Sequence, residues 1–368
     1  MEILDGKFDS TRRLPSEHQL MRRFSAARET VRCALRALLA KNLVSRRPGY
    51  GTFLTERAGA VASRTFGVIV PDAYYSFYTR ICRGIDEAAR TNGWTILSAS
   101  LGVGSMRDRA AKAVDFAEVC VREKVSGVFF QPLQFLKDGV KFNRAILDVF
   151  KRAKIPVVLL DSDYLPLPQR SEHDLVGIDN VLAGYELARH VIAQGARRIW
   201  YFSNPLPAPT SVNRGNGVGL AVAEAGLRWT KDSIFFADPT DTRAARRLLS
   251  GKNSADAIIA VNDHVAAQLL KTLTAIGKRV PEDVRLAGFN GDPSGADCVP
   301  PITTMAQPCA EIGQAAVRLM IDRIGRPDLS PREVLLPARL EPRLSSGFAR
   351  KPEKRNAKSL KKGKEGTR

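Results

Sequence analysis

The 368-residue chain is poor in the residues that build disulfide frameworks and metal centres. Its cysteines are odd in number, scattered and never spaced as a CxxC pair: Cys33, Cys82, Cys120, Cys298 and Cys309. This pattern argues against a disulfide framework or a zinc site and indicates a reducing cytoplasm. The four histidines are distant from one another, and none has a metal-ligating partner four residues later. The sequence therefore predicts no metal site and no cofactor.

Patterns typical of enzymes and membrane proteins are also missing. No Ser/His/Asp or Cys/His arrangement stands out, and the GNGVG at residues 215–219 lacks the Lys-Ser/Thr of a P-loop and the full dinucleotide spacing. No stretch approaches the apolar length that spans a bilayer, and no signal peptide opens the chain. We therefore predict a cytoplasmic protein that is not an enzyme and does not engage a membrane.

Basic residues, by contrast, are in excess and collect at the two ends of the chain. There are 57 lysines and arginines against 38 acidic residues, for a formal net charge of +19. Residues 1–57 hold 12 basic against 6 acidic residues, and residues 350–368 hold 9 against 2. This distribution favours a polyanionic partner such as double-stranded DNA. The low-complexity tail either adds non-specific DNA affinity or only keeps the chain soluble.

Residues 14–54 have the pattern of two helices followed by a basic hairpin. Apolar residues recur at helical spacing between Leu20 and Leu39, which gives each helix one apolar face. Opposite that face the second helix carries a polar and basic set: Arg28, Thr30, Arg32 and Arg36. The segment RRPGYGTF adds cations, including Arg47, and a turn that needs Gly49. This layout is typical of a winged helix-turn-helix, although a cationic helix pair on an ordinary surface is the alternative.

The same stretch resembles the GntR family of bacterial regulators. The LPSE opening, the TVR-AL-L core and the RR-x-G-x-G-T-F wing occur in order and at the family's spacing. The resemblance implies a DNA-binding set formed by His18, Arg28, Thr30, Arg32, Arg47 and Gly49. The chain departs from the family at His18, which is usually arginine, and at Ala27, which usually caps the second helix. Losing such a cap costs about 1 kcal/mol, which Ser25 or local packing can compensate. The opening MEILDGKF matches only the last part of the family's first helix.

Beyond residue 66, short β-branched runs alternate with helical segments. FGVIVPD, WTILSAS, VSGVFFQPL, IPVVLLDSD, RRIWYFSNP, DAIIAVND and VRLAGFNGD are predicted as buried parallel strands. Such an alternation indicates a doubly wound α/β fold, which binds ligands beyond the carboxyl ends of its strands. Those ends carry acids and amides: Asp72, Asp161, Asn262, Asp263, Asn290 and Asp292.

These segments resemble the LacI/periplasmic-binding-protein superfamily over residues 66 to about 346. The motifs are GVIVPD with RGIDEAA, VGIDN with RRIWYFSNP, and AVND with VPEDVRLAGFNGDP and PPITTMAQP. The resemblance implies two lobes that cross at about residues 161–176 and 296–306. A GntR head on a LacI-type sensor is similar to arabinose-responsive repressors. The expected organisation is a winged head (1–55), a linker (56–65), a two-lobed ligand-binding domain (66–346) and a basic tail (347–368).

A polyhydroxylated ligand would need carboxylates, amides, an arginine and aromatic faces. The resemblance implies an effector site formed by Asp72, Tyr75, Phe77, Tyr78, Asp161, Arg214, Asp263, Asn290 and Gln307. In this interpretation Arg214 lies on the loop before a helix at AVAEAG. The alternatives are that strand-end Asp and Asn residues cap the next helix and that the aromatic loop is ordinary lobe packing.

The two resemblances together predict a transcriptional repressor. Two heads of a homodimer would bind a pseudo-palindromic DNA operator, and a small, carbohydrate-like effector between the lobes would change their arrangement. Two alternatives remain open: a sugar-binding receptor whose head no longer docks on DNA, and a regulator that responds to a purine-like effector.

Overall fold

The computed structural model describes most of the chain. The described residues are 13–40, 43–55, 64–71, 76–99, 101–102, 104–251 and 254–347. The predicted remnant of a first helix, most of the predicted linker and the basic tail lie outside them. The predicted linker included residue 65, but Thr65 already belongs to the first strand of the following domain.

The described part of the head forms two helices and a β-hairpin. Helices α1 (Glu17–Phe24) and α2 (Arg28–Ala40) precede strands β1 (Val44–Arg47) and β2 (Gly51–Leu54), which pair antiparallel. Helix α1 begins with a reciprocal cap, because Ser16 Oγ accepts from the Gln19 N–H while Gln19 Oε1 accepts from the Ser16 N–H at 2.8 Å. Ser25 has a left-handed backbone (φ 47°) at the end of α1, so it lies in the turn rather than at the start of α2.

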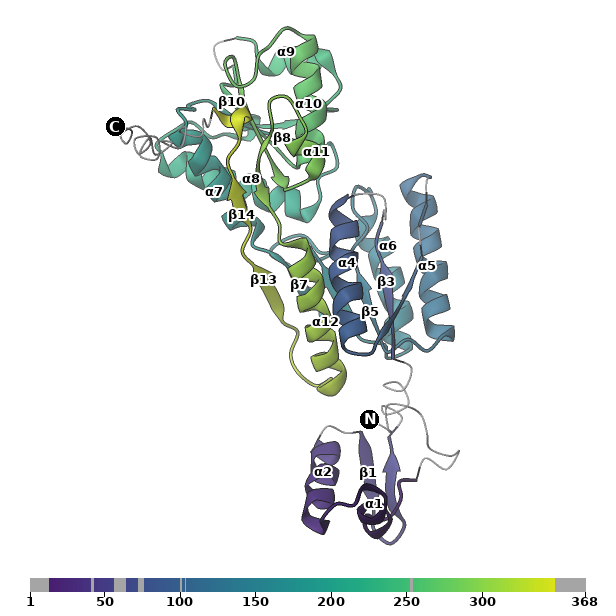
Figure 1. The fold of residues 1–368 in the computed structure, drawn as a ribbon. Helices are drawn as coiled ribbons and strands as arrows, with labels where there is room; N and C mark the ends of the chain where they lie inside the picture. The colour runs from purple at the N-terminus through teal and green to yellow at the C-terminus, as the bar shows by residue number, and fades with distance from the viewer. Residues whose placement is uncertain are drawn as a thin grey trace, which may run out of the picture.

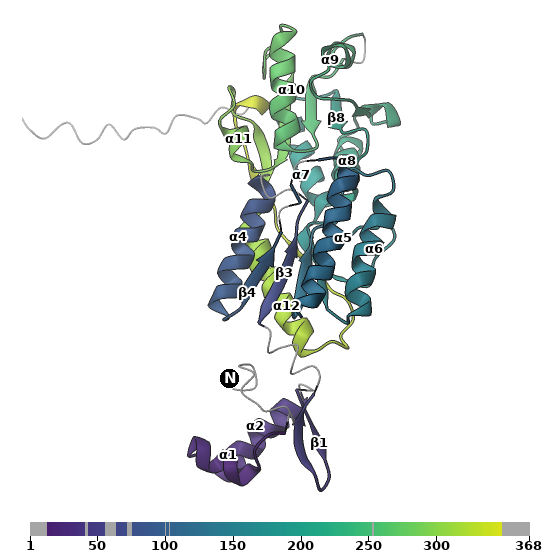
Figure 2. The same ribbon diagram turned by 90° about the vertical axis from the view of Figure 1, so that its right-hand side faces the viewer.

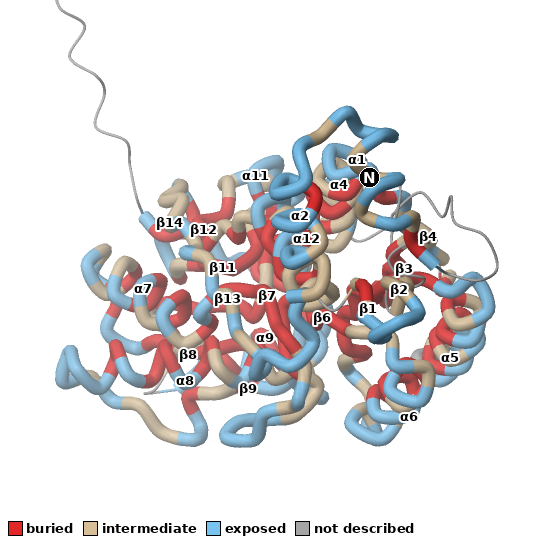
Figure 3. The backbone as a smooth tube through the Cα atoms, turned by 90° about the horizontal axis from the view of Figure 1, so that it is seen from below, coloured by how far each residue is buried: buried red, intermediate tan, exposed pale blue. Residues whose placement is uncertain are grey.

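The hydrophobic core of the head is thin. Among its described residues, only Leu14, Val31 and Val44 are buried hydrophobic side chains. Leu35 is half-buried, and Phe24 on α1 is 54% exposed. The predicted apolar faces therefore exist but are only partly covered within the described residues. In Figure 3 the head is correspondingly drawn mostly in the colours of exposed and intermediate residues.

Two six-stranded sheets follow, and each forms the centre of one lobe (Figure 1). Lobe 1 has the order β13-β7-β6-β5-β3-β4, with all neighbours parallel. Its strands are β3 (Thr65–Ile69), β4 (Thr95–Ser98), β5 (Gly127–Phe130), β6 (Val157–Leu160), β7 (Asp174–Ile178) and β13 (Glu333–Leu336). Lobe 2 has the order β14-β12-β11-β10-β8-β9, with only β14 antiparallel. Its strands are β8 (Ile199–Ser203), β9 (Ile234–Phe236), β10 (Ala257–Ala260), β11 (Arg285–Asn290), β12 (Thr303–Ala306) and β14 (Arg339–Glu341).

Helices cover both faces of each sheet, which confirms the predicted doubly wound α/β fold. In lobe 1, α4 (Ser76–Thr91) and α12 (Cys309–Gly325) pack together on one face, and α5 (Met106–Arg122) and α6 (Gly139–Arg152) on the other (Figure 2). In lobe 2, α7 (Asn180–Ala193) pairs with α8 (Pro209–Glu224), and α9 (Thr242–Leu248) with α10 (Asp263–Ala275). The short helix α11 (Pro293–Ala296) follows β11. The inner strands β5, β6, β7 and β10 are buried along their whole length, as continuous apolar strands of a doubly covered sheet should be, whereas the edge strands β4, β13 and β14 are partly exposed.

The chain crosses between the lobes three times within the described residues. The crossings are β7 to α7, β12 to α12, and β13 to β14. The predicted first crossing at 161–176 was too early, because residues 174–178 still pair with β6 and β13 in lobe 1. The second crossing falls at residues 306–309, just after the predicted range, and the third was not predicted.

The segment GNGVG lies inside a helix rather than on a loop. Helix α8 begins at Pro209, so Arg214 belongs to its N-terminal half, which corrects the predicted loop position. Each of its three glycines has a close neighbour: Gly217 lets α7 pack at backbone distance, Gly215 faces the Tyr201 ring and Gly219 faces the Trp229 indole. A Cβ on Gly217 would lie 1.9 Å from the Val181 carbonyl oxygen, and one on Gly184 would lie 2.1 Å from the Arg214 carbonyl oxygen. The glycines therefore serve helix packing.

Candidate functional site

The predicted DNA-binding residues all lie on the exposed surface of the head. Arg28, Thr30 and Arg32 lie on α2, the second helix of the helix-turn-helix, and His18 lies on α1. Arg47 ends β1, and Gly49 lies in the turn between the strands with φ 78°, a left-handed conformation that favours glycine. No neighbouring atom lies within 4 Å of a Cβ built on Gly49, so the wing tip is open.

The cations of the head differ in how they are paired. Arg32 and Arg46 both approach the Glu17 carboxylate at 3.5 Å, and the Arg47 guanidinium lies 5.2 Å from the Phe53 ring centroid. Arg28 makes no ion pair with any described residue. Because ion pairs this exposed contribute little, exchanging them for phosphate contacts costs little. The exposed Tyr50 beside Gly49 was not predicted as a site residue, although its place at the wing tip is evident from the sequence.

A cavity of about 410 Å³ lies between the lobes at the carboxyl ends of their strands. Five of the nine predicted effector residues line it: Phe77, Tyr78, Asp161, Arg214 and Asn290. Asp263 and Gln307 are buried beside it without lining it. Asp72 and Tyr75 lie outside the described residues. Phe77 and Tyr78 belong to the first turn of α4 rather than to a loop, and their rings are 5.2 Å apart.

Arg214 is held rigidly at the lobe 2 side of the cavity. It is only 4% exposed, its Nε donates to Asn180 Oδ1 at 2.9 Å, and its Nη1 donates to the Val261 carbonyl oxygen at 2.8 Å. The guanidinium also lies 4.9 Å from the Phe289 ring centroid. Nη2 makes no hydrogen bond with any described residue. Because Arg214 lines the cavity and its other nitrogens are engaged, Nη2 is the part of the guanidinium that is left for a ligand.

Asp161 follows β6 on the lobe 1 side. Its backbone is left-handed (φ 65°) and it is buried. Burial raises its pKa to about 6, opposed by the Arg214 charge and by the Gln131 and Gln307 side chains. Asp161 Oδ1 is buried without a hydrogen-bond partner among the described residues. A buried acceptor of this kind is suited to a donor group of a ligand.

Asn290 is positioned by contacts from both lobes. Gln307 Nε2 donates to its Oδ1 at 2.9 Å, and Arg80 Nη2 of α4 donates to its backbone oxygen at 2.9 Å. Its positive φ of 102° is thus held by neighbours. Arg80 also approaches the Asp292 carboxylate at 3.6 Å, and Ser76 Oγ donates to the same carboxylate.

Asp263 is turned away from the cavity. Its Oδ2 accepts from the Asp292 N–H at 2.8 Å and from Thr304 Oγ1 at 2.9 Å. Burial raises its pKa to about 7, partly opposed by these two hydrogen bonds. Asn262, the residue before it, caps α10 by accepting from the Val265 N–H at 2.8 Å and also lines the cavity. The cap that the sequence offered as an alternative for Asn262 is therefore present.

Several lining residues were not predicted. Lobe 1 adds Arg109, Gln134 and Phe135, and lobe 2 adds Asn204, Thr210, Ser211, Asp238, Thr240, His264 and Gln268. Arg109 lies on α5, a helix absent from the predicted elements, and His264 was not among the predicted site residues. These residues line the cavity because of the way the two lobes face each other, and the sequence alone does not reveal that arrangement.

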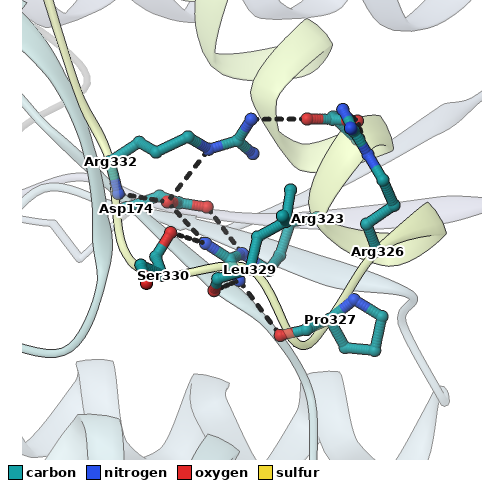
Figure 4. A network of polar contacts seen from close by, with 8 residues as sticks. Asp174, Arg323, Arg326, Pro327, Leu329, Ser330 and Arg332 are labelled. Atoms are coloured by element: carbon teal, nitrogen blue, oxygen red, sulfur yellow. Dashed lines mark hydrogen bonds and ion pairs between the residues drawn. The ribbon is translucent and has the colours of Figure 1, made fainter.

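The three lobe 1 elements that are joined to the interlobe connections, β7, α12 and β13, meet at one buried carboxylate, Asp174, at the end of lobe 1 opposite the connections and nearest the head (Figures 1 and 4). Asp174 starts β7, Arg323 lies near the end of α12, and Arg332 immediately precedes β13. Arg323 Nε and Nη2 donate to the two Asp174 oxygens at 2.8 Å each, and the Arg332 N–H donates to Oδ1 at 2.8 Å. Arg323 also donates to the carbonyl oxygens of Pro327 and Ser330 at 3.0 Å each. We call Asp174, Arg323 and Arg332 the clasp.

Within the described residues, neither a membrane-spanning helix nor a cluster of metal-ligating side chains is found. No helix there is long and apolar enough to cross a membrane. No group of three or more His, Cys, Asp or Glu side chains there could hold a metal ion.

The fold and the cavity define a two-lobed ligand-binding domain attached to a winged DNA-binding head. Residues 1–54 match the model of the bacterial regulatory proteins of the gntR family, and residues 188–346 match that of the periplasmic binding protein-like domain. The chain thus carries a GntR head and a LacI-type, periplasmic-binding-protein-like effector domain, as the sequence predicted.

Similar proteins are transcriptional regulators rather than enzymes, in agreement with the sequence analysis. The HTH-type transcriptional repressor CytR of Escherichia coli K12 is 27% identical over 265 residues, which cover 71% of this chain and 73% of CytR. The transcription regulator CcpA of Lactococcus lactis has a similar fold, with a TM-score of 0.65 and 24% identity over 76% of this chain and 98% of that one. A LacI family transcriptional regulator from Enterococcus faecium with bound ribose has a TM-score of 0.61 and 25% identity, over 76% of this chain and 98% of that one. Over its effector domain the chain is thus similar to LacI-family transcriptional regulators.

Proposed function

We propose that this chain is a transcriptional repressor that binds its operator as a homodimer in the bacterial cytoplasm and that a small, carbohydrate-like effector between the lobes controls its DNA affinity. The observation that carries the proposal is the cavity between the lobes. This cavity is lined by Arg214, whose guanidinium is fixed but has one nitrogen without a hydrogen bond, and by Asp161 and Asn290 at strand ends. The same chain also carries a DNA-binding head.

In the proposed DNA complex, α2 lies in the major groove and the wing approaches the minor groove. Arg28 and Thr30 project from the exposed face of α2 near its N-terminus, where side chains of a recognition helix reach base edges. Arg32 would exchange Glu17 for a phosphate, while His18 and Arg47 add contacts on either side. Gly49 lets the wing backbone come close to the sugar-phosphate chain. Two heads related by a two-fold axis would contact the half-sites of a palindrome.

In the proposed effector complex, polar groups of both lobes bind one small molecule. Arg214 Nη2, Asp161 Oδ1 and the Asn290 amide are the inner polar groups, and Phe77 and Tyr78 supply aromatic surface. The volume of about 410 Å³ lies at the small end of the range for small-molecule sites, which favours a monosaccharide-sized ligand. The ribose in the Enterococcus faecium structure supports this size class.

Control of DNA binding requires that the effector prefers one arrangement of the lobes. The clasp provides a structural connection, because it ties the three segments that run between the interlobe connections and the end of lobe 1 nearest the head, namely β7, α12 and β13. A change in lobe angle that moves these segments would be transmitted there. In the dimer, such a shift would alter the spacing of the two heads.

The rival function is a sugar-binding receptor without gene regulation. The thin core of the head, with Phe24 54% exposed, is the observation that favours it. The two functions differ in DNA binding, so a gel-shift assay on the chain's own upstream DNA separates them. The Arg28→Ala variant should bind the operator at least tenfold more weakly, while Arg228→Ala, on the exposed surface of lobe 2, should bind like wild type. Equal binding by both variants would contradict the proposed α2 interface.

A further inference from the structure

Two side chains on one face of α4 in lobe 1 contact the same acidic residue of lobe 2. Ser76 and Arg80 are four residues apart, so they lie one above the other on the helix. The Ser76 hydroxyl donates to Asp292 Oδ1, and Arg80 Nη2 approaches the same oxygen at 3.6 Å. The Asp292 side chain is 3% exposed, and its Oδ2 is buried without a hydrogen bond to any described residue. Arg80 therefore compensates, from lobe 1, a buried carboxylate of lobe 2.

The same guanidinium holds the backbone of a residue that lines the cavity. Arg80 Nη2 donates to the Asn290 carbonyl oxygen at 2.9 Å, and Asn290 lines the cavity between the lobes. Asn290 has φ 102°, and the residue after it, Gly291, has φ 66°. A side chain rarely adopts such a backbone, and the conformation persists only where neighbouring groups hold it. The orientation of Asn290 therefore depends on its hydrogen-bond partners.

Two further hydrogen bonds hold this turn from within lobe 2. The Gly291 N–H donates to Thr304 Oγ1 at 3.1 Å, and the Asp292 N–H donates to Asp263 Oδ2 at 2.8 Å. The hydrogen bond from Arg80 differs from these two because it comes from the other lobe. A rotation of the lobes leaves the internal contacts of lobe 2 in place but moves Arg80 relative to the turn.

We propose that Arg80 is a positioning residue of the effector site, because it binds the Asn290 backbone from lobe 1 and so directs the Asn290 amide toward the effector. Asn290 Oδ1 already accepts from Gln307 Nε2, so the amide N–H groups are the part that can reach a ligand. An effector that binds them prefers the lobe arrangement in which Arg80 is engaged, which is the condition for control of DNA affinity. The inference rests on the proposed function, since it concerns the same cavity.

The test separates the two roles of Arg80, compensation of Asp292 and the hydrogen bond to Asn290. Arg80→Met keeps an unbranched, helix-forming side chain but removes both roles, so it should lower the Tm by leaving the Asp292 carboxylate unpaired. The double variant R80M/D292N lacks that buried charge and should have a Tm near that of D292N. Comparison of these two variants then isolates the hydrogen bond to Asn290, which a purely structural charge partner would not need.

Two measurements on the full chain make this comparison. Without ligand, the amide protons of Gly291 and residue 292 should exchange about fivefold faster in R80M/D292N than in D292N, as expected for the loss of one hydrogen bond. In calorimetry, ribose should bind about fivefold more weakly to R80M/D292N than to D292N. The matched control is Arg83→Met on the same helix, where Arg83 is 78% exposed and pairs with Glu87. It should leave both measurements at their wild-type values.

Several results would overturn the inference. Equal exchange in R80M/D292N and D292N would mean that Arg80 does not hold the turn and only compensates Asp292. Faster exchange with unchanged ribose affinity would mean that the Asn290 amide is not positioned for the ligand. A wild-type chain that binds neither ribose, galactose nor adenosine would count against the proposed effector site itself, whereas the exchange measurement would still confirm or refute the hold of Arg80 on Asn290.

Discussion

Removing the Arg323 guanidinium should destabilise the effector domain strongly. The Asp174 side chain is fully buried and Arg323 is 12% exposed, so the Arg323→Ala variant leaves a carboxylate in a protein interior. Breaking a buried pair from one side costs about 3–5 kcal/mol. The Arg332 N–H still donates to Asp174, and the Arg332 guanidinium lies 3.9 Å away. We therefore expect the lower end, about 3 kcal/mol, which is roughly 6–12 °C in Tm for a domain of this size.

Thermal unfolding followed by circular dichroism measures this effect. The matched control is Lys151→Ala, because Lys151 pairs with Glu172 on the same lobe with both side chains about two-thirds exposed. This control should keep a Tm near wild type. The double variant D174N/R323A should be more stable than R323A alone, because no buried charge remains unpaired. If R323A lowered the Tm no more than the control, the clasp would not hold β7, α12 and the start of β13 together.

Three further predictions concern other parts of the molecule. Gly217→Ala should destabilise lobe 2 by about 1–3 kcal/mol in denaturant titration, because its Cβ would meet the Val181 oxygen at 1.9 Å, whereas Gly325→Ala, with open space around it, should be neutral or slightly stabilising. Asp161 has a pKa of about 6 against an ordinary 3.8, so the folded chain binds more protons between pH 4 and 6 and loses stability as the pH rises through that window. Asp161→Asn should thus raise the free energy of unfolding by on the order of 2 kcal/mol at pH 8 and leave it unchanged below pH 4. Equal Tm shifts at the two pH values would contradict this reasoning. Ser16→Ala should cost α1 about 1 kcal/mol, seen as faster exchange of the Gln19 amide proton.

The α/β fold was predictable because buried parallel strands need continuous apolar runs. The segments at β3, β5, β6, β10 and β11 all have such runs, and all are strands. The prediction missed β7, which begins with the buried Asp174, because that carboxylate is compensated by Arg323 from 149 residues away. A partner so distant in sequence leaves no local pattern. The first crossing was therefore placed too early.

The helix around Arg214 shows how packing overrides local propensity. The resemblance placed Arg214 on a loop before a helix at AVAEAG, and glycine is in general unfavourable inside helices. In the structure Gly217 of this segment, with Gly184 of α7, allows the two helices to approach at backbone distance, and α8 extends from Pro209 to Glu224. Tertiary packing compensates for the poor propensity, and this compensation cannot be seen in one segment alone.

The sequence predicted which types of residue form the candidate site, but not which way their side chains point. Asp161, Asn262 and Asn290, which lie at the ends of predicted strands, line the cavity, because parallel strands gather their carboxyl ends at one edge. Whether a side chain faces the cavity depends on neighbours that are far away in sequence. Asp263 turns toward Thr304, 41 residues later, whereas Arg109 reaches the cavity because lobe 1 faces lobe 2. Contacts between the two lobes leave no periodic pattern in the sequence from which they could be predicted.

The most direct test of the account is fluorescence anisotropy of the full chain on the DNA upstream of its own gene. A scrambled duplex of equal length serves as the control near physiological salt, because electrostatic binding would otherwise imitate recognition. We predict that the chain prefers the native duplex by about a thousandfold or more. Among candidate effectors, the ligand that raises the Tm most should change the affinity for this duplex by roughly 5- to 150-fold. Equal and steeply salt-dependent binding to both duplexes, unaffected by that ligand, would contradict it.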